Sequence, residues 1–78
     1  MAHVVVPIPH DAWAVIREPV SLESIHDDRA HALDHARELA RREGGGVIVS
    51  YTEAWMMLAE RLVLGSRKYR NEAGSRLN

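Results

Sequence analysis

Two histidines and a glutamate stand at helical spacing in the middle of the sequence. His31 and His35 are four residues apart and Glu38 follows three residues later, so a helix would place all three on one face. Imidazole and carboxylate groups bind zinc in proteins, but a site needs three or four ligands at one point. The chain has no cysteine, and no further ligand is fixed nearby. We therefore expect exposed polar side chains here and no metal site. The remaining histidines are expected at the surface or at strand ends: His3, His10 and His26.

Hydroxyl and glycine residues offer no recognisable catalytic arrangement. None of the five serines is flanked by the glycines of a nucleophile elbow. The glycines at 44–46 end a predicted helix and enter a predicted strand, whereas phosphate-binding loops leave a strand and begin a helix. A chain of 78 residues also has little room for a cleft. We expect no enzyme activity and no cofactor.

Charge is distributed unevenly along the chain. Residues 1–60 carry five basic and ten acidic side chains, a net charge of −5, whereas residues 61–78 carry five basic and one acidic, a net charge of +4. An acidic body repels phosphate, so any nucleic-acid binding should be weak and should use the tail. There Arg67, Lys68 and Arg70 could contact phosphate while Tyr69 stacks on a base. The alternative is a tail that only aids solubility.

Four acidic residues and no basic one lie between positions 18 and 28 after Arg17: Glu18, Glu23, Asp27 and Asp28. Such a segment can compete for a basic groove on a protein partner, and the attraction would speed association. The alternative is a solvated loop followed by a helix cap. Both interpretations stay open.

Residues 52–64 predict an apolar helix that Thr52 caps and Gly65 ends. One stripe contains Trp55, Leu58, Ala59 and Leu62, but further apolar side chains lie partly outside it. The helix is therefore either an ordinary core helix or a surface for a partner or a second copy, since Trp and Met are enriched at interface centres. The candidate contacts of that surface are Trp55, Met56, Met57 and Leu64.

Residues 28–43 predict a second, amphipathic helix. Ala32, Leu33, Ala36, Leu39 and Ala40 form its apolar stripe. Asp27 or Asp28 can cap its first turn, and Gly44 can adopt the left-handed conformation that ends it. Because most of the stripe is alanine, we expect this helix to lie close to a sheet.

The other elements predict an α+β domain at residues 1–65 with a basic, flexible tail at 66–78. Residues 3–8 form a strand in which Pro7, without an N–H, indicates a sheet edge or a strand end, and residues 13–17 pair with them as a hairpin around Pro9-His10-Asp11. Residues 20–26 are a connection without periodicity, in which Leu22 and Ile25 can reach the core. Residues 47–51 are apolar on both faces and form a central strand. The expected fold is a three-stranded, mainly antiparallel sheet in ββαβα order.

Several of these motifs occur together in one known family. They are His3-Val4-Val5-Val6-Pro7, Trp13-Ala14-Val15, Arg17-Glu18, Asp27-Asp28, Ala36-Arg37-Glu38-Leu39-Ala40-Arg41-Arg42, Gly44 and Val47-Ile48-Val49. Over about residues 3–50 the chain resembles the small bacterial domain-of-unknown-function family 2188. The resemblance implies a ββαβ core and no known activity. Asp28, His31 and Ser50 depart from the family's threonine, glutamate and histidine, and the C-terminal helix differs, which suggests a different partner or oligomer.

These observations predict a small non-enzymatic protein-interaction module. Its concrete form would be a phage-type inhibitor or regulator that docks on a larger assembly, and the alternative is a nucleic-acid-binding accessory protein that uses the tail. A homodimer is expected because a short chain without disulfides needs additional burial. No membrane partner is expected because no apolar run approaches the length of a membrane span. The absence of cysteine and of a secretory signal favours the cytoplasm.

Overall fold

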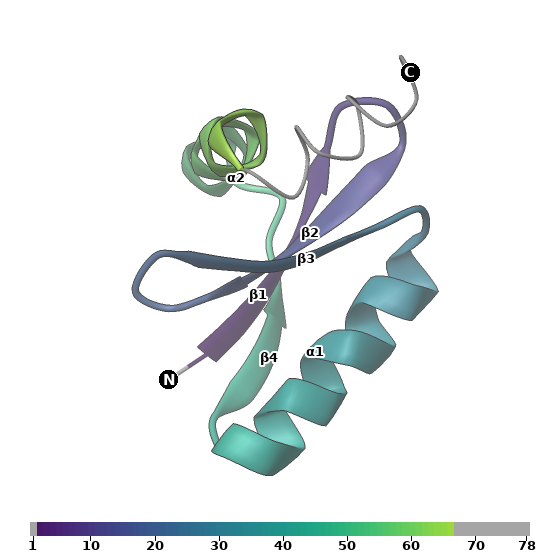
Figure 1. Cartoon of the computed structure of the whole chain (residues 1–78), viewed down its shortest axis with the longest axis vertical. Helices are drawn as coiled ribbons and strands as arrows, with labels where there is room; N and C mark the ends of the chain where they lie inside the picture. The colour runs from purple at the N-terminus through teal and green to yellow at the C-terminus, as the bar shows by residue number, and fades with distance from the viewer. Residues whose placement is uncertain (1, 67–78) are drawn as a thin grey trace.

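A sheet with one helix on each face forms the structure, a computed structural model that describes residues 2–66 (Figure 1). The elements in chain order are β1 (Ala2–Ile8), β2 (Ala12–Arg17), β3 (Ser21–His26), α1 (Arg29–Glu43), β4 (Gly46–Val49) and α2 (Glu53–Gly65). No helix within the described residues is long and apolar enough to span a membrane.

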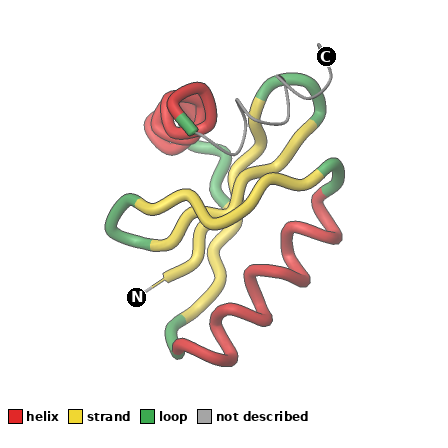
Figure 2. The backbone as a smooth tube through the Cα atoms, viewed as in Figure 1, coloured by secondary structure: helices red, strands yellow, loops and turns green. Residues whose placement is uncertain are grey.

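The sheet has four strands in the order β3-β2-β1-β4. β1 and β2 pair antiparallel, as do β2 and β3, whereas β4 runs parallel to β1. The α+β class and the β1–β2 hairpin are confirmed, but the expected three-stranded, mainly antiparallel sheet is wrong. The sheet is mixed because α1 carries the chain back before β4 joins the free side of β1 (Figure 2).

β3 was predicted as a connection, and its irregular pairing explains the error. The register passes from Val15 opposite Ser24 to Ile16 opposite Leu22, so Glu23 is the extra residue of a β-bulge. Leu22 and Ile25 consequently pack against the same core cluster although they are three residues apart. A regular strand would point them to opposite faces, which is why the sequence shows no two-residue period here.

Pro7 indicates an edge strand or a strand end, and the second alternative fits: β1 lies between two neighbours, and Pro7 stands near its end. The pairing of β1 with β4 ends at Val5 opposite Val49. The Val5 carbonyl accepts a hydrogen bond from the Ser50 N–H on the β4 side. Pro7, two residues later, presents its nitrogen to that same side, beyond the last β4 pair. The missing N–H therefore costs no ladder hydrogen bond, and Pro7 is tolerated inside the sheet.

β4 is an edge strand, and its prediction as a central strand is also wrong. Val47 and Val49 pack on the cluster beneath α1. Ile48 points to the other face and remains exposed. α2 contacts β1, β2 and β3 but, among residues 2–66, does not contact β4. The apolar run Val47-Ile48-Val49 therefore forms a strand that a helix, α1, covers on one face only.

α1 covers one face of the sheet as predicted. Asp28 caps it by accepting a hydrogen bond from the His31 N–H at 2.9 Å. Gly44 ends it with φ = 82°, a left-handed conformation that favours glycine. The buried residues between α1 and the sheet are Ala32, Ala36, Leu39, Val5 and Val15. The two buried alanines allow the helix backbone to lie close to the strands.

α2 covers the opposite face and is seen nearly end-on in Figure 1, whereas α1 lies across the view. Thr52 caps it by accepting a hydrogen bond from the Trp55 N–H at 3.3 Å. Ala59 and Val63 are buried, and Trp55 and Leu62 pack around them. The strand residues of this second core are Val4, Val6, Ile8, Ala14 and Ile16.

Candidate interaction surface

The outer side of α2 presents three exposed apolar side chains. Met56, Met57 and Leu64 are 39%, 51% and 58% exposed, respectively. Trp55 belongs to the same set of contacts predicted from the sequence, but its side chain packs against the core. We call Met56, Met57 and Leu64 the α2 outer surface. Residues 57 and 64 are seven apart, so they lie on the same side of the helix, and exposed Glu60 and Arg61 lie between them in the sequence.

The four acidic residues of positions 18–28 lie before, within and after β3. Glu18 precedes the strand and its Oε1 accepts a hydrogen bond from the Ala2 N–H at 3.1 Å. Glu23 lies within β3, and its Oε2 is 4.0 Å from Nη2 of Arg17 in β2. Asp27 and Asp28 follow the end of the strand, where Asp28 caps α1 and contacts His31 at 3.0 Å. Pairing with β2 thus brings a basic group beside an acidic run that contains none in the sequence.

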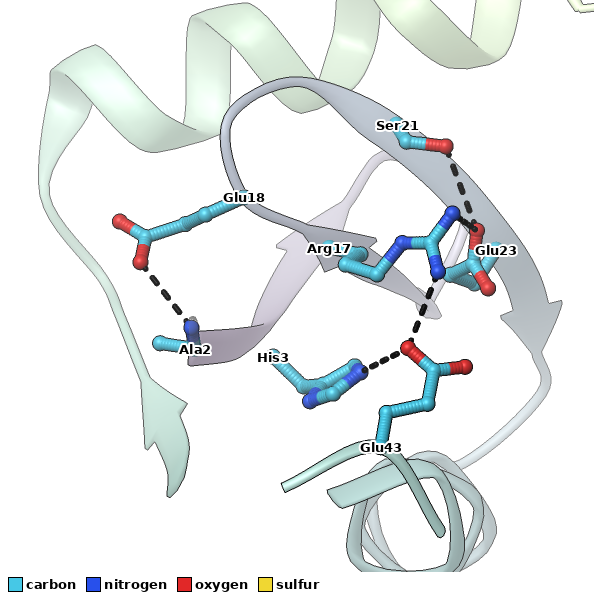
Figure 3. Close-up of polar contacts among 7 residues, drawn as sticks. All are labelled: Ala2, His3, Arg17, Glu18, Ser21, Glu23 and Glu43. Carbon is cyan, nitrogen blue, oxygen red and sulfur yellow. Dashed lines mark hydrogen bonds and ion pairs between the residues drawn. The ribbon is translucent and has the colours of Figure 1, made fainter. Parts of the chain in front are cut away.

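A polar cluster ties the C-terminal end of α1 to the sheet (Figure 3). Arg17 donates a hydrogen bond from Nη1 to Glu43 Oε1 at 2.9 Å. His3 Nε2 lies 3.6 Å from the same oxygen, which is longer than a hydrogen bond, so that contact is electrostatic only. The hydrogen bond to Arg17 holds the pKa of Glu43 below its usual range, and it raises the pKa of Arg17. The cluster therefore favours a charged carboxylate at the end of α1.

His3 was expected at the surface or at a strand end, yet its side chain is fully buried. It lies in β1 and faces the same side of the sheet as Val5, toward α1. Neither ring nitrogen has a hydrogen-bond partner within residues 2–66. The sequence signal for this burial is the place of His3 in the strand. His3 lies two residues before the buried Val5, and so on the same face, in a strand that has neighbours on both sides.

A pair of histidine rings lies where β3 leads into α1. The rings of His26 and His35 lie with their centroids 5.2 Å apart. His26 Nε2 lies 2.8 Å from Ser24 Oγ, and His31 turns to Asp28. Partial burial and the nearby charges of His35 and His31 lower the pKa of His26, against a smaller opposing effect of Asp28 and Asp27. Across residues 2–66, no three side chains of His, Cys, Asp or Glu converge to hold a metal ion.

We predict that His26 makes folding stability fall as the pH drops below about 6.5, the ordinary histidine value. Its folded pKa is lowered, so the unfolded chain binds a proton more readily, and acid favours unfolding. In thermal unfolding, the loss of folding stability between pH 7.5 and pH 5 should be smaller in His26→Gln than in the wild type. His10→Asn, in the exposed β1–β2 turn, is the control. An unchanged pH profile in His26→Gln would contradict the prediction.

The candidate nucleic-acid residues Arg67, Lys68, Tyr69 and Arg70 lie outside the described residues. The candidate protein-binding residues are all described, and they lie in three separate groups: on α2, in β3 with the two residues that follow it, and in the turn before β3.

Comparison with known proteins gives a match to a family. No curated protein and no solved structure matches the chain. The pattern of DUF2188, described as an uncharacterized protein conserved in bacteria, matches residues 2–53. That range contains the whole sheet and α1 and ends where α2 begins. Since it spans more than half of the chain, the protein belongs to the DUF2188 family.

Proposed function

We propose that this protein is a small non-enzymatic interaction module that regulates or inhibits a larger protein assembly by docking through the α2 outer surface. The observation that supports the proposal is the exposure of Met56, Met57 and Leu64 on a helix that already packs its other side on the sheet. These side chains are not needed to close the core, because Ala59 and Val63 occupy that position.

The chemistry of the α2 outer surface suits a protein partner. Methionine is flexible and polarizable, so it can adapt to the shape of a partner surface. Exposed Glu53, Glu60 and Arg61 surround the apolar side chains, and an apolar patch with a polar rim is typical of protein-binding sites. The family match ends at residue 53, so almost all of α2 lies outside it. The proposed binding helix is thus added to a shared core and can serve a partner of this chain's own.

Photo-crosslinking in the native cells tests the proposal. A photoreactive amino acid at Met57 should yield a discrete crosslinked product, whereas the same group at Arg41, exposed on α1, should not. A photoreactive group at Leu64 should give a crosslinked product as well, and Met57→Glu in the same chain should abolish it, because a charge would enter an apolar contact. Mass spectrometry of the product identifies a foreign protein or a second copy. Absence of any product specific to α2 would contradict the docking role.

A further inference from the structure

The two edges of the sheet differ in how they are protected against pairing. β3 carries a bulge at Glu23, a charged side chain and polar residues along its length. Bulges and charges are the devices with which proteins protect an edge strand from pairing with another chain. β4 has neither: the segment from residue 44 to residue 52 contains no charged residue and no proline. As far as residues 2–66 are concerned, the β4 edge is open to a further strand.

The backbone of β4 has hydrogen-bonding groups directed away from β1. The Ser50 N–H donates to the Val5 carbonyl at 3.0 Å, so Ser50 faces β1. Because successive residues of a strand alternate, Ile48 also faces β1 with its backbone groups, whereas Val47 and Val49 direct theirs outward. Within residues 2–66 these outward groups have no strand beside them, since β4 is the last strand in the sheet order of that part of the chain.

The Ile48 side chain adds an apolar contact to this edge. It is 49% exposed on the face that α2 covers over the other strands. A β-branched side chain in a strand packs well against its neighbours on the pleated surface. Ile48 lies at the centre of Val47-Ile48-Val49, a triplet that is the same in either direction. A two-fold axis at Ile48 would therefore place identical or matching residues opposite one another.

We propose that β4 pairs antiparallel with β4 of a second copy of this chain across a two-fold axis at Ile48. Val47 of each copy then exchanges backbone hydrogen bonds with Val49 of the other. Ile48 forms the non-hydrogen-bonded pair between them, where Cα atoms approach to about 4.5 Å. The two sheets become one continuous sheet, and the open edges are removed. A second copy fits better than an unrelated strand because the register is self-complementary, and an isologous contact closes at a dimer.

This pairing does not depend on the proposed docking function. Among the described residues α2 does not contact β4, so a change at Ile48 leaves the α2 outer surface in place. Met57→Glu should conversely leave the dimer intact. The two proposals can therefore fail separately.

Sedimentation equilibrium of the full chain is the first test. The wild type should have the mass of a dimer, and Ile48→Lys should have the mass of a monomer because two like charges would face each other. Val20→Lys is the matched control, since Val20 is 51% exposed but lies beyond the other end of the sheet order, before β3. It should remain a dimer. A monomeric wild type at high micromolar concentration, or a dimeric Ile48→Lys, overturns the proposal.

A charge exchange tests the register. Ile48→Lys and Ile48→Glu should each be monomeric, and their equimolar mixture should recover dimer mass as a heterodimer, because residue 48 faces residue 48. Failure of the mixture to associate overturns the two-fold at Ile48. Amide hydrogen exchange on the wild type needs no variant: the Val47 and Val49 N–H groups should exchange more slowly as concentration rises. Exchange that is independent of concentration overturns the pairing even if the variants do not fold.

Discussion

Replacing Ile16 with alanine is expected to lower the free energy of unfolding by about 2–5 kcal/mol. Ile16 is fully buried in β2, and it belongs to the cluster that α2 covers. The loss combines the transfer free energy of the removed methyl and methylene groups with the cavity that remains. Small domains have a total stability of about 5–15 kcal/mol, so this one change should remove a large part of it.

Urea unfolding followed by circular dichroism measures the change. The midpoint should fall in Ile16→Ala, whereas Val20→Ala, at an exposed site before β3, should stay within about 0.5 kcal/mol of the wild type. A loss below about 1 kcal/mol in Ile16→Ala would show that α2 can collapse onto the site or is not held against it. The experiment therefore also tests whether α2 packs on its own sheet in solution.

Both helices could be predicted from the sequence because their signals are local. The apolar stripe of α1, its cap at Asp28 and its end at Gly44 all lie within one continuous segment. The same holds for α2, where Thr52 and Gly65 mark the limits that the structure shows to within a residue. Caps and periodicity are read over a few turns of chain, so no tertiary contact is needed to interpret them.

The sheet was predicted less well because its order depends on contacts between distant segments. Pro7 indicates a sheet edge or a strand end when β1 is considered alone, and only the length of β4, which does not reach Pro7, decides between them. Val47-Ile48-Val49 indicates a central strand, yet nothing local states that α2 does not reach Ile48. The bulge at Glu23 shifts the pattern of β3 by one residue, and a period of two cannot be found across it.

The candidate site shows the same division. Met56, Met57 and Leu64 were found from the surplus of apolar residues on one helix, which is a local property. The acidic residues of positions 18–28 look like an uninterrupted acidic surface in the sequence. In the fold, Arg17 of β2 contacts Glu23 of β3 across the two strands, and a contact of that kind cannot be read along the chain. His3 was missed for a related reason: its burial depends on α1 and on two neighbouring strands.

His3 provides the second large expected effect, and its direction is a gain. Both ring nitrogens are buried without a hydrogen-bond partner in residues 2–66, and Glu43 offers only a contact at 3.6 Å. A buried polar group without a partner costs about 1–3 kcal/mol. Leucine has a similar size and no polar atom, so His3→Leu is expected to raise the free energy of unfolding by about 1–3 kcal/mol.

Arg17 should continue to hold Glu43 in His3→Leu, because its hydrogen bond does not involve the histidine. The matched control is His3→Gln, which keeps polar atoms at the same buried position and should give no such gain. Urea unfolding of the three proteins at one pH compares them directly. A loss of stability in His3→Leu would show that the imidazole is satisfied in solution and that its contact with Glu43 outweighs the cost of burial. A gain confined to leucine would instead identify His3 as a polar group that the fold buries at the expense of its own stability.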